Sequence, residues 1–348
     1  LSVAREDLAE ELVSLTSEQY EIIDHWAGAS RILCDSPAGC GKTLLAVEML
    51  RRLLASDEDV LMIVGATLLA RALRRKLGMQ PKHLVSMQEV ENGILSDRGR
   101  AARLIVDEGQ QLLSIDRITT INDLLEGGLE NGRWVWFGDL HHQGPAGDKE
   151  AERCLAQLAG HASVTPVLRR NCRNTPEIIN ATELATGVGL GHAIVRGRGL
   201  SVRIESASDE SGLIMKAALQ LQEWLDEDVP ASAIVVLVDQ KDPSGFVAQL
   251  AHAGKRRIAP WGGDGAGSNV RFSPVEAFRG LESEFVLLCI ANDTTDEQHL
   301  RRMLYVGMTR ANVALQIVAT SHNADKVRGF MHDQAMYQIT TSGTEQGK

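Results

Sequence analysis

Residues 36–43, which read SPAGCGKT, include the side chains best suited to chemistry. Gly39 and Gly41 would let successive backbone N–H groups turn toward a phosphate group. Lys42 would reach the β- and γ-phosphates, and the Thr43 hydroxyl would bind Mg²⁺ at the positive N-terminus of a following helix. The loop therefore predicts a binding site for a nucleoside triphosphate, ATP, together with Mg²⁺.

Two acidic positions follow apolar stretches further along the chain. Asp107 and Glu108 come directly after the stretch 103–106. Beside the phosphate loop, Asp107 would bind Mg²⁺, while Glu108 would orient and deprotonate an attacking water. Asp139 follows the stretch 134–137 after one glycine. That position would sense the γ-phosphate, although a glycine and an aspartate after a strand also form ordinary turns.

Short apolar runs alternate with helical patterns along most of the chain. The predicted strands are 31–34, 60–65, 103–106, 134–137, 202–205, 233–238, 285–290 and 314–319. Helical patterns fall between them, as at 212–225 and 244–253. This alternation predicts an α/β fold with mostly parallel sheets and helices on both faces. Ligands of such sheets bind beyond the carboxyl ends of the strands, where these motifs lie.

The length of 348 residues predicts two domains. We expect them at 1–165 and 166–340, followed by a polar tail at 341–348. No apolar run reaches about 18 residues, so we expect no membrane-spanning helix. The five cysteines lack metal-ligand spacing and indicate reduced thiols in a cytoplasmic protein. The first residue is Leu1, which indicates a processed N-terminus or a piece of a longer protein.

The charge of the chain is unevenly distributed. The net charge of −10 argues against a nucleic-acid partner. Residues 66–88, however, contain no acidic side chain. Basic residues in this segment are Arg71, Arg74, Arg75, Lys76 and Lys82. The segment fits either a solvated helix face or a groove that contacts nucleic-acid phosphates, and its spacing alone leaves both open.

Six motifs in order extend the phosphate loop into a larger pattern. They are LTSEQ at 15–19, DEGQ at 107–110, GD at 138–139, LRRNCR at 168–173, FRGLE at 278–282 and LYVGMTRA at 304–311. The series resembles that of the superfamily 1 helicases, nearest to the UvrD-like branch, from residue 15 to about 319. The resemblance implies two RecA-like domains with ATP bound in the cleft between them.

The resemblance also implies roles for single residues. Gln19 would read the adenine, and Gln110 would couple the state of the γ-phosphate to the rest of the site. Arg173 and Arg310, from the second domain, would act as arginine fingers on the γ-phosphoryl group. Glu282 would contact the ribose. Closure of the two domains would then complete the site and drive movement.

By the same resemblance, the basic segment would lie against a nucleic-acid strand. The implied contacts are Arg71, Arg74, Arg75, Lys76 and, through its hydroxyl, Ser86. Phosphate contacts of this kind are independent of base sequence and sensitive to salt. The implied partner is single-stranded DNA, or RNA, with movement in the 3′→5′ direction.

The chain departs from the helicase pattern at several positions. Cys172 stands where relatives have a tyrosine that stacks on adenine. His142 falls at the position of a coupling glutamine and Gln143 follows it, so either could take that role. Residues 144–147, GPAG, replace an aromatic cluster that stacks on bases, and accessory insertions are absent. We therefore expect a two-lobed motor whose missing functions come from another domain or partner, such as a nuclease.

Three functions compete at this point. The leading one is an ATP-dependent translocase or helicase on single-stranded nucleic acid. The second is an ATPase switch regulated by DNA or a protein partner, with little unwinding activity. The third is a small-molecule kinase or another P-loop transferase, against which the paired arginines and the RGLE motif argue.

Overall fold

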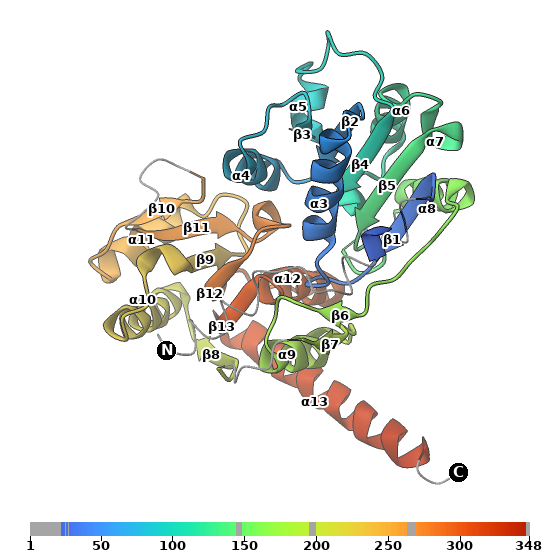
Figure 1. The fold of residues 1–348 in the computed structure, drawn as a ribbon. Coiled ribbons are helices and arrows are strands. Elements are labelled where there is room, and N and C mark those ends of the chain that lie inside the picture. The colour runs from blue at the N-terminus through green and yellow to red at the C-terminus, as the bar shows by residue number, and fades with distance from the viewer. Residues whose placement is uncertain are drawn as a thin grey trace. The chain divides into compact units, whose positions relative to one another are not determined.

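The computed structural model describes residues 22–24, 26, 28–143, 148–194, 200–262 and 269–345, with side chains up to 341. The chain forms two compact units, one ending at Asn171 and the other beginning at Cys172. Each unit is built on a parallel β-sheet flanked by helices (Figure 1). The predicted α/β fold is thereby confirmed, and it is compatible with two RecA-like domains. No described helix is both long enough and apolar enough to cross a lipid bilayer.

The first unit has a five-stranded sheet in the order β1-β5-β4-β2-β3. In that order the strands are β1 (Arg31–Asp35), β5 (Arg133–Gly138), β4 (Arg103–Asp107), β2 (Val60–Val64) and β3 (Leu84–Ser86). Every neighbouring pair is parallel. β2 and β4 are buried along their whole lengths. Continuous burial is typical of parallel strands covered on both faces.

Helices cover this sheet on both sides. They are α3 (Lys42–Ala55), α4 (Thr67–Leu77), α5 (Met87–Glu91), α6 (Ile115–Asp123), α7 (Gly128–Asn131), α8 (Lys149–His161) and the short η1 (Gly109–Leu112). One core joins α6 and α8 to alternate strand residues, among them Ile63, Val106 and Trp136. α3 contacts β2, β4 and β5. The core thus fixes the strand ends from which the phosphate loop and the carboxylates emerge.

The second unit has a six-stranded sheet in the order β10-β11-β9-β12-β13-β8. In that order the strands are β10 (Ile258–Pro260), β11 (Val270–Pro274), β9 (Ile234–Val238), β12 (Ser283–Ile290), β13 (Ala311–Thr320) and β8 (Arg203–Ala207). All neighbouring pairs are parallel. The chain also forms two-residue strands, β6 (Arg170–Asn171) and β7 (His192–Ala193).

Five longer helices accompany the second sheet. They are α9 (Pro176–Thr186), α10 (Glu210–Asp226), α11 (Ser244–Ala253), α12 (Glu297–Met308) and α13 (Ser321–Glu345), with 3₁₀ turns η2 (Ala231–Ala233) and η3 (Glu276–Phe278). α10 and α11 share a core with Leu287 and Cys289 of β12. Leu288, between them, packs against Gly307 of α12. Because side chains alternate along a strand, α12 covers the opposite face.

The eight predicted strands are present, whereas β3, β10 and β11 were not predicted. β3 and β10 have three residues each, and the five-residue β11 includes Arg271 and Pro274, which interrupt an apolar pattern. The two-residue strands β6 and β7 were not predicted either. The two units part at Asn171, later than the boundary expected at residue 165. The reason lies in the segment 163–168, which stays bound to the first unit. Leu33 N–H donates to Val164 O, and Leu168 N–H donates to the Ser36 hydroxyl at 2.7 Å.

Candidate nucleotide-binding site

The phosphate loop connects β1 to α3, as its sequence predicts. Gly39 and Gly41 have φ values of 85° and 81°, in the left-handed region that favours glycine. A Cβ atom at Gly39 would lie 2.5 Å from the side chain of Asn171. The Asn171 amide donates to Ala38 O at 3.2 Å. Asn171 therefore packs on the loop, a contact that sequence analysis missed although the residue lies within the LRRNCR motif.

The Lys42 side chain bends back into the loop. Its ammonium group donates to Ser36 O at 2.6 Å and to Pro37 O at 2.7 Å. The residue is 8% exposed. The charge of Lys42 is therefore held inside the curve of the loop, where the predicted phosphate-binding role requires it.

Asp107, at the end of β4, is a fully buried carboxylate. Neither of its oxygens has a hydrogen-bond partner of good geometry among the described residues. Burial, and then the charge of Glu108, raise the pKa of Asp107 to about 7, while the nearby Thr43 hydroxyl, a backbone N–H and Lys42 oppose the rise. Burying a carboxylate without well-placed donors is costly unless a cation compensates it.

The surroundings of Asp107 fit a magnesium ion. In the described part of the chain, no group of three or more His, Cys, Asp or Glu side chains could hold a metal by itself. Mg²⁺ usually takes one or two protein oxygens and completes its shell with phosphates and water. Asp107 and Thr43 could supply such a partial set, and their role as Mg²⁺ ligands stays a prediction.

Glu108 has an unusual backbone conformation. Its φ of 54° and ψ of 38° lie in the left-handed region, which glutamate seldom adopts. Gly65, beyond the neighbouring strand β2, makes room for it, since a Cβ there would meet Glu108 O at 2.4 Å. The Glu108 carboxylate accepts a hydrogen bond from the Gln110 amide at 2.7 Å. Strained backbone of this kind concentrates at functional sites.

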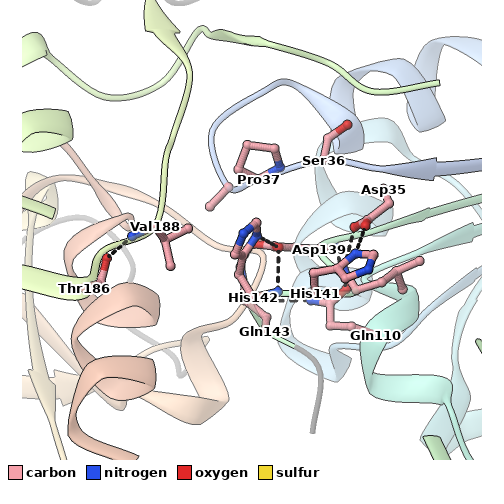
Figure 2. Close-up of polar contacts among 12 residues, drawn as sticks. Asp35, Ser36, Pro37, Gln110, Asp139, His141, His142, Gln143, Thr186 and Val188 are labelled. Carbon is pink, nitrogen blue, oxygen red and sulfur yellow. Dashed lines mark hydrogen bonds and ion pairs between the residues drawn. The ribbon is translucent and has the colours of Figure 1, made fainter. Parts of the chain in front are cut away.

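Gln110 connects Glu108 to the end of β5. Figure 2 shows Gln110 with Asp139 and Gln143. Its Oε1 accepts from Asp139 N–H at 3.2 Å, and its Nε2 lies 3.5 Å from Gln143 Oε1. Gln143 Nε2 in turn donates to Asp139 Oδ2 at 3.1 Å. Between the two residues that the sequence left open for coupling, Gln143 is the one that reaches Gln110. His142 bonds instead to Asp139, through Nδ1 at 2.9 Å.

Two residues of the predicted nucleic-acid surface have structural partners. Both terminal nitrogens of Arg74 donate to Glu89, at 2.8 and 2.5 Å. Ser86 is fully buried and caps α5, its hydroxyl accepting from Glu89 N–H. Arg74 is the main cause that lowers the pKa of Glu89 to about 2. Arg74 and Ser86 thus join α4 to α5, whereas Arg71, Arg75 and Lys76 are exposed on α4.

In the second unit, the predicted arginines and Glu282 come together from distant segments. Arg173 Nε donates to the Glu282 carboxylate at 2.6 Å. Arg310 is buried, and its guanidinium donates to Val306 O at 3.0 Å and to Leu281 O at 3.3 Å. The Asn174 amide donates to Thr309 O and Ala311 O. Segments 173–174, 281–283 and 309–311 therefore form one polar cluster.

Comparison with known proteins gives little beyond this geometry. No known protein family matches the chain. No curated protein matches it either. One solved structure with some similarity is the C-terminal domain of a possible DNA helicase from Lactobacillus plantarum WCFS1. It covers 44% of this chain and 92% of its own, with 19% sequence identity and a TM-score of 0.34.

Some of the remaining residues singled out in the sequence are described by the structure, and others are not. Gln19 and residues 144–147 lie outside the described residues. Cys172, at the start of the second unit, is half-buried. Within the first unit, described contacts join the phosphate loop, the Asp107–Glu108 pair and the Gln110 network; the second unit, taken by itself, contains the arginine cluster.

Proposed function

We propose that the chain is an ATPase that couples hydrolysis to movement along single-stranded nucleic acid. The observation that carries the proposal is Asp107. Its carboxylate is buried without a well-placed hydrogen-bond donor among described residues, directly beside the Thr43 and Lys42 side chains of a phosphate loop. A purely structural aspartate at this position would be expected to have donors of its own.

The first unit contributes phosphate binding and activation of water in this proposal. Lys42 and the loop N–H groups hold the triphosphate, and Thr43 and Asp107 hold Mg²⁺. When bound, the metal ion neutralises charge on the phosphate oxygens. Glu108 orients the attacking water and accepts its proton, and the hydrogen bond from Gln110 fixes the direction of its carboxylate.

The second unit contributes positive charge. In the proposal, Arg173 and Arg310 stabilise the γ-phosphoryl group in the transition state, and Glu282 binds the ribose. The ion pair between Arg173 and Glu282 supports a shared role, because one carboxylate orients the guanidinium while staying half exposed to a ligand. Binding of the ribose by Glu282 and stabilisation of the transition state by Arg173 would then depend on one ion pair.

Movement on nucleic acid is supported by the order of the six helicase-like motifs and by the exposed cations of α4. Arg71, Arg75 and Lys76 lie within one and a half turns of this helix. Exposed cations on a single helix form a sequence-independent contact for a phosphate backbone. The proposed substrate is single-stranded DNA, read without base specificity and traversed 3′→5′.

The test is the rate of ATP hydrolysis with single-stranded DNA, with single-stranded RNA and with neither, over a series of salt concentrations. The proposal expects strong stimulation by DNA that declines steeply as salt rises. Substitution of the three exposed α4 cations by Gln serves as the matched control and should remove most of the stimulation. Absence of ATP hydrolysis under all three conditions would contradict the proposal.

A second candidate is an ATPase switch regulated by a partner protein or domain, for example a nuclease. It is favoured by the structural roles of Arg74 and Ser86, which remove two residues from the predicted nucleic-acid contacts. The same assay separates the two candidates. ATP hydrolysis that stays equal with and without nucleic acid would select the switch.

A further inference from the structure

His142 forms a hydrogen-bonded pair with a buried carboxylate at the end of β5 (Figure 2). Its ring Nδ1 lies 2.9 Å from Asp139 Oδ1, and its backbone N–H donates to the same oxygen at 3.3 Å. Asp139 is 1% exposed, whereas the His142 side chain is 36% exposed. The imidazole is therefore anchored through Nδ1 on a buried carboxylate, and the side chain is partly exposed.

The pair lies next to the phosphate loop. Asp35, the last residue of β1, is in register with Gly138 of β5. The first N–H of the loop, that of Ser36, donates to Gly138 O at 3.0 Å. The ionisable groups that act on His142 are Asp139, Asp35 and Lys42. Lys42 has the smallest of these influences and opposes protonation of His142.

The pair is also connected to Glu108. Asp139 accepts from Gln143, and both of these residues bond to Gln110, which donates to the Glu108 carboxylate. The groups in this series of hydrogen bonds are side-chain amides and carboxylates, apart from the backbone N–H of Asp139. A change in the charge of His142 therefore acts on groups that orient Glu108.

Protonation would change His142 without breaking its anchor. Neutral imidazole that donates from Nδ1 to Asp139 has no proton on Nε2. Imidazolium keeps the Nδ1 hydrogen bond and adds an Nε2–H donor and a positive charge. The hydrogen bond to Asp139 raises the pKa of His142 above its ordinary value, burial and Lys42 oppose the rise, and Asp35 adds to it.

We propose that His142 is a protonatable positioning residue that links ATP binding to proton uptake. Its imidazolium form adds a positive charge at the end of β5, where the phosphate loop begins, and so favours the triphosphate over the diphosphate, which carries less negative charge. The inference rests on the proposed nucleotide site. It adds that this site discriminates ATP from ADP better in mildly acidic than in alkaline solution.

The test compares affinities for the non-hydrolysable analogue AMP-PNP and for ADP, both with Mg²⁺, between pH 6 and pH 8. In wild type we expect the ratio of the ADP dissociation constant to that of AMP-PNP to fall roughly fivefold from pH 6 to pH 8; ionisation of Asp107 at the shared Mg²⁺ site affects both nucleotides and cancels in this ratio. His142→Gln keeps a donor for Asp139 and should remove the pH dependence that belongs to the imidazole. Ionisation of the ligand itself affects every variant alike, so it cancels in the comparison.

His141→Gln is the matched control, because His141 is the adjacent histidine and pairs with Asp35 instead of Asp139. This variant should retain the wild-type pH dependence. The inference is overturned if His142→Gln retains that dependence, or if His141→Gln loses it equally. Tight AMP-PNP binding in wild type, with a ratio of ADP to AMP-PNP dissociation constants that is independent of pH, would overturn this inference alone. Failure to bind AMP-PNP at any pH would overturn the nucleotide site as well.

A second readout does not depend on a variant. Calorimetry of AMP-PNP binding to wild type, in buffers of different ionisation enthalpy, measures the protons taken up on binding. Asp107, whose pKa is raised to about 7, loses its proton when Mg²⁺ binds with either nucleotide, so the readout is the difference between them: we expect AMP-PNP binding to take up more protons than ADP binding near pH 7. Equal proton uptake for both nucleotides would contradict the inference.

Discussion

Asp107 and Glu108 are neighbours in the sequence, but their carboxylates have different surroundings. Asp107 is buried without a well-placed hydrogen-bond donor among described residues, whereas Glu108 accepts a bond from Gln110. The first arrangement suits a ligand for a cation, and the second suits a base whose direction must be fixed. Two adjacent carboxylates can therefore take separate roles, because a strand end and a strained residue point them into different environments.

Asp107→Asn should change how stability depends on pH. The pKa of Asp107 is raised to about 7 in the folded protein, against 3.8 ordinarily. Between about pH 4 and pH 7 the folded state keeps a proton that the unfolded state has released, so stability falls as pH rises through this window. The Asp107→Asn variant should not show this decrease in stability, because asparagine does not ionise. Without nucleotide or metal, its free energy of unfolding at pH 8 should exceed that of wild type by about 1–3 kcal/mol.

Urea unfolding of both proteins at pH 4.5 and pH 8 measures the difference. Asp139→Asn is a useful comparison, because Asp139 is buried but has hydrogen-bond donors. An Asp107→Asn variant whose stability relative to wild type is the same at both pH values would contradict the buried, uncompensated charge.

Many of the individual residues of the candidate site could be predicted from the sequence, but not all of their contacts. The short sequence pattern at residues 36–43 was enough to predict the positions of Gly39, Gly41 and Lys42. The contact of Asn171 with the loop and the pairing of Arg74 with Glu89 are not local, since each depends on how the chain returns to the sheet. A run of basic residues therefore indicated a charged surface without showing which member is already paired.

At the scale of elements, α4 has two different faces. Arg74 faces α5 and holds it through Glu89, while Arg71, Arg75 and Lys76 are exposed. The capping box at Ser86 fixes the start of α5 and brings Glu89 to the arginine. One helix thus combines a structural ion pair with exposed cations, and only the latter are available to a ligand.

Glu89→Gln should destabilise the first unit. The pKa of Glu89 is lowered to about 2, chiefly by Arg74, from an ordinary value of 4.5. The stabilisation is therefore present above about pH 4.5 and is lost as pH falls toward 2. At pH 7 we expect a loss of about 1–3 kcal/mol, which should shrink in acid. Denaturant unfolding of wild type and variant at pH 7 and pH 3 tests this, and a difference that grows in acid would contradict it.

Replacement of the exposed cations should affect binding and not stability. We consider a variant in which Gln replaces Arg71, Arg75 and Lys76. Its free energy of unfolding should stay within about 0.5 kcal/mol of that of wild type. Affinity for single-stranded DNA should fall, and the slope of log affinity against log salt should decrease by about 0.7 for each phosphate that the variant no longer neutralises. Fluorescence anisotropy with labelled DNA measures both. If the affinity for single-stranded DNA were unchanged, these three cations would form a solvated helix face that does not contact nucleic acid.

At the scale of the whole molecule, the first unit has the phosphate loop after β1, the DEGQ motif at the end of β4 and the GD motif at the end of β5, whereas the LYVGMTRA motif of the second unit runs from α12 to the start of β13. Alternation of apolar runs with helical patterns predicted this α/β arrangement, because buried parallel strands leave a continuous apolar signal. The division of the chain was harder to predict. Residues 163–168 have no strand pattern of their own, yet they bond to β1 and belong to the first unit.

The arginine cluster of the second unit should matter for hydrolysis more than for nucleotide binding. We expect Arg173→Ala to bind AMP-PNP within a few-fold of wild type and to lose about 10³-fold or more in the rate of ATP hydrolysis. Arg169→Ala, at an exposed position in the same LRRNCR motif, is the control and should behave as wild type. Normal turnover by Arg173→Ala would remove the arginine from the proposed mechanism.

The central claim is that the loop at residues 36–43 hydrolyses ATP. Its most direct test is the steady-state release of phosphate from ATP with Mg²⁺ and single-stranded DNA, by wild type and by Lys42→Ala purified in the same way. The account predicts sustained turnover by wild type and none above background by the variant. Equal rates for the two proteins, or no turnover by wild type, would contradict it.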